Sequence, residues 1–502
     1  MQTELKLKLA TADVARMREH PLLAKLATAE PREHDLIDTY YDTPALDFWR
    51  VGMTLRVRRD GDAWTQTVKT VSSGSTMLRE RGEWESRLEG ELPDPADVAR
   101  QVKPQRLRAI LLDSSITGQL QPMFTNTTHR ASWDIILPGG QLVECALDSG
   151  SIAANGNGRS AQIGELELEL KRGNPTRLFE LALQLHQDIP LEVANDSKAA
   201  RGYALLQDEA PAPVKARAVR LTRKMRMEDA LQCIGLHCLA QIESNVPGVL
   251  VRSAESLHQM RVGLRRLRAL LGMFRDLAPL PLELKESLDW LSGELGATRD
   301  WDVLADTTLP TVGGIATYAL QAAAKEHARS LHKNMLPTLH SPRYTQLMLE
   351  MNGWLRGRQW RAGAGLPQDD PLAQPALDGL VPLVRKAQKR LRKRIGALVE
   401  TDAPSRHRVR IAAKKARYAA EFFRDLLPKK EVKAYIKCLS SVQDRLGHLN
   451  DLAVASRLLP ELENHGHAHD GAYARGWVGG NAQASAEGLR AALDKVARIK
   501  LA

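Results

Sequence analysis

Charged residues alternate with apolar ones in several short segments of the first 206 residues. Because successive strand side chains point to opposite faces, each such segment gathers its acids and bases on one face. ELKLK places Glu4, Lys6 and Lys8 together, and ELELELK (165–171) places three glutamates beside Lys171. Acids spaced two apart offer oxygen ligands to Mg²⁺ or Mn²⁺, and interleaved Arg and Lys bind phosphate. Metal-assisted attack of water on a phosphoanhydride requires this combination.

The alternative interpretation is an open sheet with one charged face in water, which suits any single strand. Six segments carrying both signs of charge favour a shared charged interior instead. The sequence has no GxxxxGK[ST] loop and no plausible dinucleotide fingerprint. Phosphate recognition would therefore come from side chains. The six segments are ELKLKL (4–9), TLRVRR (54–59), AWTQTVKT (63–70), GEWESRL (82–88), QLVECALD (141–148) and IGELELELK (163–171).

A second set of charges recurs at fixed spacing in the C-terminal half. HQMRVGLRRLRALL begins at His258, and HRVRIAAKKARYAA begins at His407. Offsets of 0, 3, 7 and 10 fall within roughly 80° of arc on a helix, so each segment presents one histidine and three bases on one stripe. A second matched pair follows downstream, LGATRDWDVL (295–304) and LGHLNDLAVA (446–455). A tandem duplication would explain both pairs, and it predicts two stripes that face each other.

The matched bases favour a phosphate polymer as ligand. A single basic helix face is usually only solvated, but two facing cationic stripes repel each other unless an anion lies between them. Guanidinium forks and ammonium groups suit phosphate oxygens. The predicted binding set is His258, Arg261, Arg265, Arg266, Arg268, His407, Arg410, Lys414, Lys415 and Arg417.

Nucleic acid would explain the positive charge equally well. Residues 206–502 carry a net charge of +15 and residues 1–205 a net charge of −4, which together give the +11 of the chain; a basic half indicates a polyanionic partner. We find no helix-turn-helix signature, zinc-finger spacing or aromatic stacking platform, so nucleic acid is the weaker alternative. A further basic run, RKAQKRLRKR (385–394), could extend the surface or simply be solvated.

Two domains must position these residues. The alternating segments, separated by Gly, Pro, Asn and Asp clusters, predict an antiparallel sheet or barrel with intervening helices, one of them after Pro175. A period near 3.6 from about residue 225 predicts an all-α bundle, broken at 359–376 and 464–481. In the second break, His465, His467 and His469 could ligate a metal, but a flexible loop is the favoured interpretation. The Pro/Ala-rich QDEAPAPVKARA is the expected boundary. The predicted division is a first domain over 1–206, a linker over 207–220 and a helical domain over 221–500.

Composition and cysteine use predict a cytoplasmic protein. Of the 502 residues, 43% are hydrophobic and 26% are charged, as in ordinary folded chains. The four cysteines form no CxxC pair and predict buried thiols in a reducing compartment. The N-terminus has no signal pattern, and no run of about 18 apolar residues predicts a membrane span.

Several segments resemble the CYTH family, the triphosphate tunnel metalloenzymes. They are YYDTPALDFWRVGMTLRVRR (40–59), WTQTVK (64–69), GEWE (82–85), ECALDSG (144–150), ELELELK (165–171) and SKAARGYALL (197–206). The two histidine-containing helices resemble the CHAD domain, a polyphosphate-binding helical module, in the domain order of bacterial CYTH–CHAD proteins such as inorganic triphosphatases. The resemblance implies an α+β first domain, an eight-stranded antiparallel barrel forming a tunnel with flanking helices. It implies an all-α bundle with an internal two-fold repeat as the second domain.

The resemblance also implies roles for the charged residues of the tunnel. The cations expected to bind phosphate and support catalysis are Lys8, Arg56, Arg58, Lys69, Arg130 and Lys171, helped by Lys198 and Arg201. The expected ligands of Mg²⁺ or Mn²⁺ are Glu4, Glu165 and Glu167. The other acids expected to line the tunnel are Glu83, Glu85, Glu144, Asp148 and Glu169.

Lys6 departs from the family pattern. The family opens with an ExExK strand, whereas ELKLK carries Lys6 where the second Glu stands. An ammonium in place of a carboxylate adds positive charge beside the metal site and should weaken divalent binding, although Lys6 could instead contact phosphate. Thr125, in MFTNTTHR, is a second departure, because the family usually has an Arg near this position.

The expected function is that of a metal-dependent inorganic triphosphatase joined to a domain that binds long-chain polyphosphate, in the cytoplasm or at polyphosphate granules. The main alternative, which Lys6 supports, is a catalytically impaired tunnel that binds and targets polyphosphate. Thiamine-triphosphatase or adenylate cyclase activity is a further alternative, since those reactions use the same cation-lined tunnel.

Overall fold

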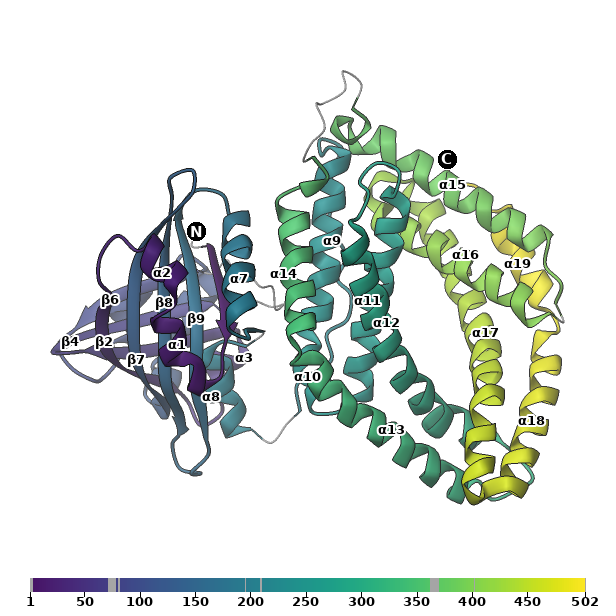
Figure 1. Cartoon of the computed structure of the whole chain (residues 1–502), viewed down its shortest axis with the longest axis horizontal. Helices are drawn as coiled ribbons and strands as arrows, with labels where there is room; N and C mark the ends of the chain where they lie inside the picture. Colours follow the sequence, from purple (N-terminus) through teal and green to yellow (C-terminus); the bar gives the residue numbers. More distant parts are fainter. Residues whose placement is uncertain are drawn as a thin grey trace. The chain divides into compact units, whose positions relative to one another are not determined.

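The computed structural model describes residues 3–70, 78–79, 82–194, 196–207, 210–361, 370–400 and 402–501. The chain forms two compact units (Figure 1). The first comprises residues 1–212 and 340–357, and the second comprises residues 213–339 and 358–502.

One antiparallel sheet forms the body of the first unit, and it contains ten strands within the described ranges. Their order is β10-β1-β9-β8-β7-β2-β3-β4-β6, and β5 pairs with β1. The strands are β1 Thr3–Lys8, β2 Arg32–Asp42, β3 Met53–Asp60, β4 Ala63–Thr70, β5 Leu78–Arg79, β6 Glu83–Leu88, β7 Gln121–Leu137, β8 Gln141–Ala154, β9 Ser160–Arg172 and β10 Glu192–Val193.

The sheet has two strands more than the eight expected, because β5 and β10 are dipeptides that share one edge of β1. β10 pairs with Leu7 and Lys8, whereas β5 pairs with Glu4 and Leu5. All six segments predicted from alternation overlap strands of this sheet. Alternation does not predict β2 or β7, because polar residues fall on both faces of these two strands.

Alternation in the strands separates a charged face from an apolar one. In β1, Leu5 and Leu7 are fully buried, while Glu4 and Lys6 lie on the other face. Apolar residues of β3 and β4, such as Leu55, pack with residues of α3, α4 and α5 in one core cluster. The helices of this unit are α1 Val14–Arg18, α2 Pro21–Leu26, α3 Asp47–Arg50, α4 Pro95–Ala99, α5 Gln105–Leu111, α6 Ser114–Thr117, α7 Thr176–Asp188, α8 Lys198–Leu206 and α14 Pro342–Arg356.

Helix α14 comes from far along the chain yet belongs to the first unit. It packs against α7, the helix predicted after Pro175, and the Nε2 atom of His186 lies 2.9 Å from the carbonyl oxygen of Pro342. His340, just before α14, pairs with Glu192 of β10 at 2.8 Å. The sequence patterns do not predict that α14 belongs to the first unit, because α14 has the same helical periodicity as its neighbours in sequence.

The second unit is helical throughout its described residues apart from short connections. Its helices are α9 Met227–Ser244, α10 Val246–Leu250, α11 Ala254–Phe274, α12 Leu282–Val303, α13 Tyr318–Leu339, α15 Ala376–Gly396, α16 Ala403–Phe422, α17 Lys429–Leu462, α18 Ala468–Ala486 and α19 Leu489–Arg498. Shorter turns in the two units are η1 Thr11–Asp13, η2 Leu304–Thr308, η3 Leu309–Thr311, η4 Gln359–Arg361, η5 Pro371–Ala373, η6 Arg424–Leu426 and η7 Glu463–His467. No helix within the described ranges is long and apolar enough to cross a membrane.

The loop predicted over 464–481 is wrong for most of that stretch. Only a kink at His465 and Gly466 interrupts the chain before α18 begins, and α18 lies beside α17 (Figure 1). Its buried residues, which include Gly471, Ala474 and Val478, are small. Small side chains let two helices approach closely, so the composition that suggested a loop here serves helix packing.

The matched sequence segments lie on helices that pack together in the second unit. The histidine-containing pair falls on α11 and α16, and the second pair falls mainly on α12 and α17. α11 contacts α16, α12 contacts α17, and each histidine-containing helix contacts the helix that follows it in sequence. This arrangement brings the two basic stripes into one region, while the duplication itself stays a prediction.

Candidate functional site

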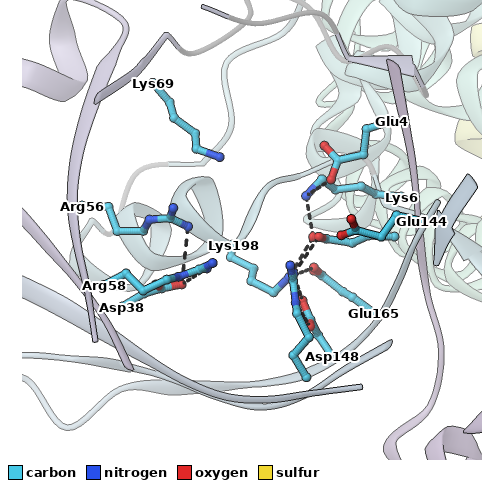
Figure 2. Close-up of polar contacts among 12 residues, drawn as sticks. Glu4, Lys6, Asp38, Arg56, Arg58, Lys69, Glu144, Asp148, Glu165 and Lys198 are labelled. Atoms are coloured by element: carbon cyan, nitrogen blue, oxygen red, sulfur yellow. Dashed lines mark hydrogen bonds and ion pairs between the residues drawn. The ribbon is translucent and has the colours of Figure 1, made fainter. Parts of the chain in front are cut away.

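The charged faces of the strands in the first unit point into one interior, which Figure 2 shows in close-up. Arg56, Arg58 and Lys69 lie on one side of this interior, and Glu4 and Glu165 lie on the other. Lys198 reaches into the space between the two sides from the start of α8. The two sides differ in how their charges are compensated.

On the cation side, Asp38 of β2 holds two arginines of β3. Arg58 makes a two-pronged contact with Asp38 at 2.7 and 3.0 Å, and Arg56 lies 3.7 Å from the same carboxylate. Burial alone would raise the pKa of Asp38, but the charges of Arg56 and Arg58 outweigh burial and lower the pKa to about 2. Asp38 therefore stays ionised and fixes both guanidinium groups.

Lys69 of β4 adds a third cation whose charge is only partly stabilised. It lies 2.7 Å from Glu83 of β6, the residue directly opposite in the strand register. Burial and the nearby charge of Arg56 nevertheless lower the pKa of Lys69 to about 8. An anion bound here would favour the protonated form of this lysine.

Buried polar atoms without hydrogen-bond partners among the described residues lie on β3 and β7, the two strands that flank Asp38 of β2. They are the Nε atom of Arg56, both side-chain amide atoms of Asn126 and the hydroxyl of Thr128. Asn126 is directly opposite Asp38 in the register, and both Asn126 and Thr128 are buried. A buried polar atom left unpaired costs about 1–3 kcal/mol. These groups indicate a site for a polar ligand.

The acid side is built around Asp148, Glu165 and Glu167, which we call the acid cluster. One carboxylate oxygen from each lies within 4.8 Å of the others, and all three residues are buried. The strand register explains this closeness, because Asp148 of β8 stands directly opposite Glu165 of β9. Hard carboxylate oxygens at this spacing are a suitable donor set for Mg²⁺ or Mn²⁺.

An ammonium group already lies among these carboxylates. The Nζ atom of Lys198 is 2.7 Å from Asp148, 2.6 Å from Glu165 and 2.9 Å from Glu167. Burial would lower the pKa of Lys198, but the three carboxylates hold that pKa well above its usual value. Arg130 and Arg201 bind the cluster from the sides, through Asp148 and Glu165 respectively.

Lys6 completes this compensation. Its Nζ atom lies 2.9 Å from Glu4 and 2.5 Å from Glu167, which is its partner in the β1–β9 register. Burial alone would raise the pKa of Glu167, yet Lys198, Lys6 and Arg130 hold it well below its usual value. The acid cluster suits a divalent cation by donor type, but Lys198 occupies the position between the donors. The site as it stands therefore does not fit a metal.

Positive charges of the second unit converge with fewer carboxylates beside them, the ion pairs being Arg261 with Asp300 and Arg417 with Glu421. We call Arg261, Arg265, Arg299, Arg410, Lys414 and Arg417 the central cationic cluster. Burial, Arg410 and Arg265 lower the pKa of Lys414 to about 7, and burial and Arg265 lower the pKa of Arg261 to about 10. The Nε atoms of Arg265 and Arg410 are buried without a hydrogen-bond partner among the described residues. These features are expected of a site that binds a polyanion.

The same contacts recur around the two histidines. Arg261 lies near Asp300 of α12, and Arg410 lies near Asp451 at the matched position of α17. Burial and Arg299 lower the pKa of His258 to about 4, and burial and Arg410 lower the pKa of His407. Both imidazoles therefore resist protonation at neutral pH.

Comparison with known proteins follows the two units. A family model described as CYTH domain matches residues 1–203, and one described as CHAD domain matches residues 233–460. The crystal structure of the CHAD domain from the plant Ricinus communis is 36% identical, with a TM-score of 0.53, and the match covers 58% of this chain and 99% of that chain. The chain belongs to the CHAD family and also contains a CYTH domain.

A curated relative supports the CYTH assignment. The inorganic triphosphatase of Haemophilus influenzae is 32% identical over 207 residues, which cover 41% of this chain. The chain matches only 55% of the length of that relative. The expected resemblance to CYTH and CHAD domains is thus confirmed, and helix α14 of the sheet unit lies within the span of the CHAD match.

The remaining predicted residues of the CYTH domain lie elsewhere on these strands, and Lys8 stands directly opposite Glu165 in the β1–β9 register. Lys8 lines a cavity of about 440 Å³ together with Arg201, Glu192 and His340. Lys171 pairs with Glu144 at 3.1 Å and with Glu169 at 3.0 Å. Glu85 is exposed on β6.

Thr125 does not line the charged interior. It pairs with Thr39 and Ala153 in the register, and its neighbours Phe124 and Asn126 are the fully buried residues of this part of β7. The side chain of Thr125 is therefore on the opposite face of β7 from Asn126. The sequence patterns missed Asp38 and Asn126; the available signal for Asp38 was its position on the same strand face as the apolar residues Leu36 and Tyr40.

Three predicted bases of the CHAD domain are not in the central cationic cluster. Arg266 is buried, pairs with Glu421 at 2.9 Å and lies over the ring of Phe422, while its role in binding stays a prediction. Arg268 is exposed and pairs with Asp289. Lys415 is exposed as a residue, and partial burial of its ammonium together with Arg390 of α15 lowers its pKa. The run over 385–394 therefore contributes at least one base near Lys415.

Proposed function

We propose that the CYTH domain binds and hydrolyses inorganic tripolyphosphate or a related triphosphate. The observation that carries this proposal is the group of cations Arg56, Arg58 and Lys69 on one side of the interior, together with the unpaired buried atoms of Arg56 and Asn126. Phosphate oxygens would accept hydrogen bonds from Arg56 and from the Asn126 amide, and cations aligned along one wall match a chain of charged phosphates. The triphosphatase relative agrees with this substrate class.

In the proposed reaction, the oxygen of water bonds to the terminal phosphorus and the bridging P–O bond breaks, giving pyrophosphate and orthophosphate. Arg56, Arg58 and Lys69 would stabilise the negative charge that develops on the transferred phosphoryl group and the leaving group. Lys8, Arg130 and Lys171 keep their proposed roles as further phosphate contacts. Glu4, Glu165 and Glu167 are the carboxylates that would hold Mg²⁺ or Mn²⁺ if the site opened, but Lys198 contacts Glu165 and Glu167, and Lys6 contacts Glu4 and Glu167.

The test is phosphate release from tripolyphosphate by the full chain with Mg²⁺ and with Mn²⁺, comparing the natural protein with Lys6→Glu. Thiamine triphosphate and ATP serve as parallel substrates, since the same interior would suit them. Robust release by the natural protein supports the proposal and identifies Lys6 as tolerated. No release by either protein from any of the three substrates would overturn it.

A second candidate function is polyphosphate binding without hydrolysis. The observation that favours it is that Lys6 bridges Glu4 and Glu167. Two of the proposed metal ligands are therefore already paired with an ammonium group. In this case the natural protein releases no phosphate with either metal, and Lys6→Glu restores release. Release by the natural protein would exclude this candidate.

For the CHAD domain we propose binding of long-chain polyphosphate at the central cationic cluster. The lowered pKa of Lys414 and the buried, unpaired Nε atoms of Arg265 and Arg410 support a ligand that supplies many closely spaced oxygens. Competition by duplex DNA and RNA against labelled polyphosphate tests this assignment. Competition by nucleic acid at equal phosphate concentration would favour the nucleic-acid alternative.

Polyphosphate binding also leads us to propose that the protein associates with polyphosphate granules in cells. The measurement is the distribution of a fluorescently tagged full chain in cells with and without polyphosphate. A tagged protein that stays diffuse in polyphosphate-rich cells would contradict this proposal.

A further inference from the structure

The ammonium of Lys198 stands at the one position in the acid cluster where a divalent cation would sit. Its contacts with Asp148, Glu165 and Glu167 are all between 2.6 and 2.9 Å, so it is almost equally distant from one oxygen of each. Mg²⁺ needs its oxygen ligands at about 2.1 Å on all sides. The ion and the ammonium therefore cannot share this position.

Helix α8 fixes Lys198 there rather than leaving it free to swing. Lys198 is the first residue of α8, directly after Ser197, whose side chain accepts a hydrogen bond from the Ala200 amide. Further along, the Tyr203 hydroxyl donates to Asp42 at 2.9 Å and its ring stacks on Trp49. The side chain of Lys198 is only 12% exposed. The contacts of α8 therefore hold Lys198 in a fixed position in the site.

The charges around the acid cluster are already balanced. Glu4 and the acid cluster supply four carboxylates, and Lys6, Lys198, Arg130 and Arg201 contact them with four positive charges. A divalent ion entering this arrangement would meet no net negative charge. Removing the ammonium of Lys198 would leave four carboxylates with three cations, an excess of one negative charge at the acid cluster.

We propose that Lys198 is a built-in counter-cation that closes the acid cluster to divalent metal ions in the ligand-free protein. Lys198 thus determines which cation this site holds: its own ammonium, in preference to Mg²⁺ or Mn²⁺. The inference concerns the site of the proposed hydrolysis but does not rest on turnover. It can stand if the protein hydrolyses nothing, and it can fail while hydrolysis is observed.

The test is binding of Mn²⁺ alone to the metal-free full chain. Binding is measured as the loss of the electron paramagnetic resonance signal of free Mn²⁺. We compare the natural protein, Lys198→Met, Lys198→Met with Glu167→Gln, and the control Lys171→Met. Lys171 also pairs with two carboxylates, but outside the acid cluster. Lys198→Met should bind one Mn²⁺ at least about 30-fold more tightly than the natural protein, which corresponds to about 2 kcal/mol.

The added affinity should disappear with Glu167→Gln and should be absent from Lys171→Met. Tight binding of one Mn²⁺ by the natural protein, unchanged in Lys198→Met, would overturn the proposal. If Lys198→Met does not fold without metal, its thermal unfolding is followed with rising Mn²⁺, and Lys198→Gln is measured in parallel. Mn²⁺-dependent stabilisation of either variant supports the proposal, and no Mn²⁺ effect on both would contradict it.

Discussion

The CYTH interior and the central cationic cluster of the CHAD domain both concentrate positive charge, but they compensate it differently. In the CYTH interior, carboxylates surround Lys198 and hold its pKa well above its usual value, despite burial. In the CHAD domain, burial and neighbouring cations lower the pKa of Lys414 to about 7. The carboxylates around Lys198 therefore stabilise its charge without a ligand. In the central cationic cluster, neighbouring cations repel one another, and a bound anion would relieve this repulsion.

The largest effect should come from removing charge at the central cationic cluster. Arg265→Ala combined with Arg410→Ala should weaken polyphosphate binding by about 100-fold or more, since each charge-assisted hydrogen bond is worth about 1.5–3 kcal/mol. Fluorescence polarisation with labelled polyphosphate measures this loss. Lys433→Ala, on the exposed surface of α17, is the matched control and should change affinity less than about twofold. A comparable loss in the control would mean that binding is diffuse.

In the CYTH interior the corresponding change is Lys69→Met. It should lower kcat/KM for tripolyphosphate by about 100-fold, because it removes a cation facing the proposed phosphate chain. Since the pKa of Lys69 is about 8, triphosphate affinity of the natural protein should fall as pH rises through 8. Lys69→Arg, which keeps its charge, should lose less activity and show a flatter profile. Equal pH profiles for the natural protein and Lys69→Arg would show that Lys69 does not contact the substrate.

Two glycines test whether the two domains respond independently. A Cβ atom at Gly202 of α8 would lie 2.1 Å from the ring of Phe124. A Cβ atom at Gly447 of α17 would meet no atom within 4 Å apart from its chain neighbours and its own helix backbone. Gly202→Ala should lower the free energy of unfolding of the CYTH domain by about 1–3 kcal/mol. Gly447→Ala should raise that of the CHAD domain by up to about 1 kcal/mol. Differential scanning calorimetry measures both, and an unchanged transition for Gly202→Ala would contradict the packing around α8.

The smallest expected effect is proton uptake by Lys414. A bound anion raises the lowered pKa of this lysine, so the complex holds more protons than the free protein and affinity falls as pH rises through 7. One linked proton gives at most about tenfold weaker binding per pH unit. Calorimetry in two buffers of different ionisation enthalpy measures the uptake, and Lys414→Arg should abolish it. Uptake that persists in Lys414→Arg would assign the proton to another group.

Much of the fold was predictable because alternation and helical periodicity record which face of each element is buried. The six predicted segments overlap strands, and the matched histidine helices lie together. β2 and β7 were missed because residues such as Asp38 and Asn126 are polar at buried positions, which alternation counts as exposed. The division at 207–220 and the roles of individual site residues stay predictions.

Charge pairing was the least predictable part of the site. The sequence placed Lys6 beside the proposed metal ligands, but nothing in its spacing showed that Lys198, near the far end of the domain, reaches the same carboxylates. That contact depends on the docking of α8, which rests on Gly202, Tyr203 and Asp42. Long-range packing of this kind leaves no periodic signal along the chain.

Helix α14 has a consequence for synthesis of the protein. Because α14 belongs to the first unit, that unit is incomplete until residue 357 has left the ribosome, and by then residues 213–339 have already emerged. Proteins with sequential domains can finish the first domain before the second is made. Helix α7 therefore cannot pack against α14 until much of the helical unit has been translated. A stop codon after residue 212 should therefore yield a first domain with an uncovered helix, whereas in the full chain the two units must mature together.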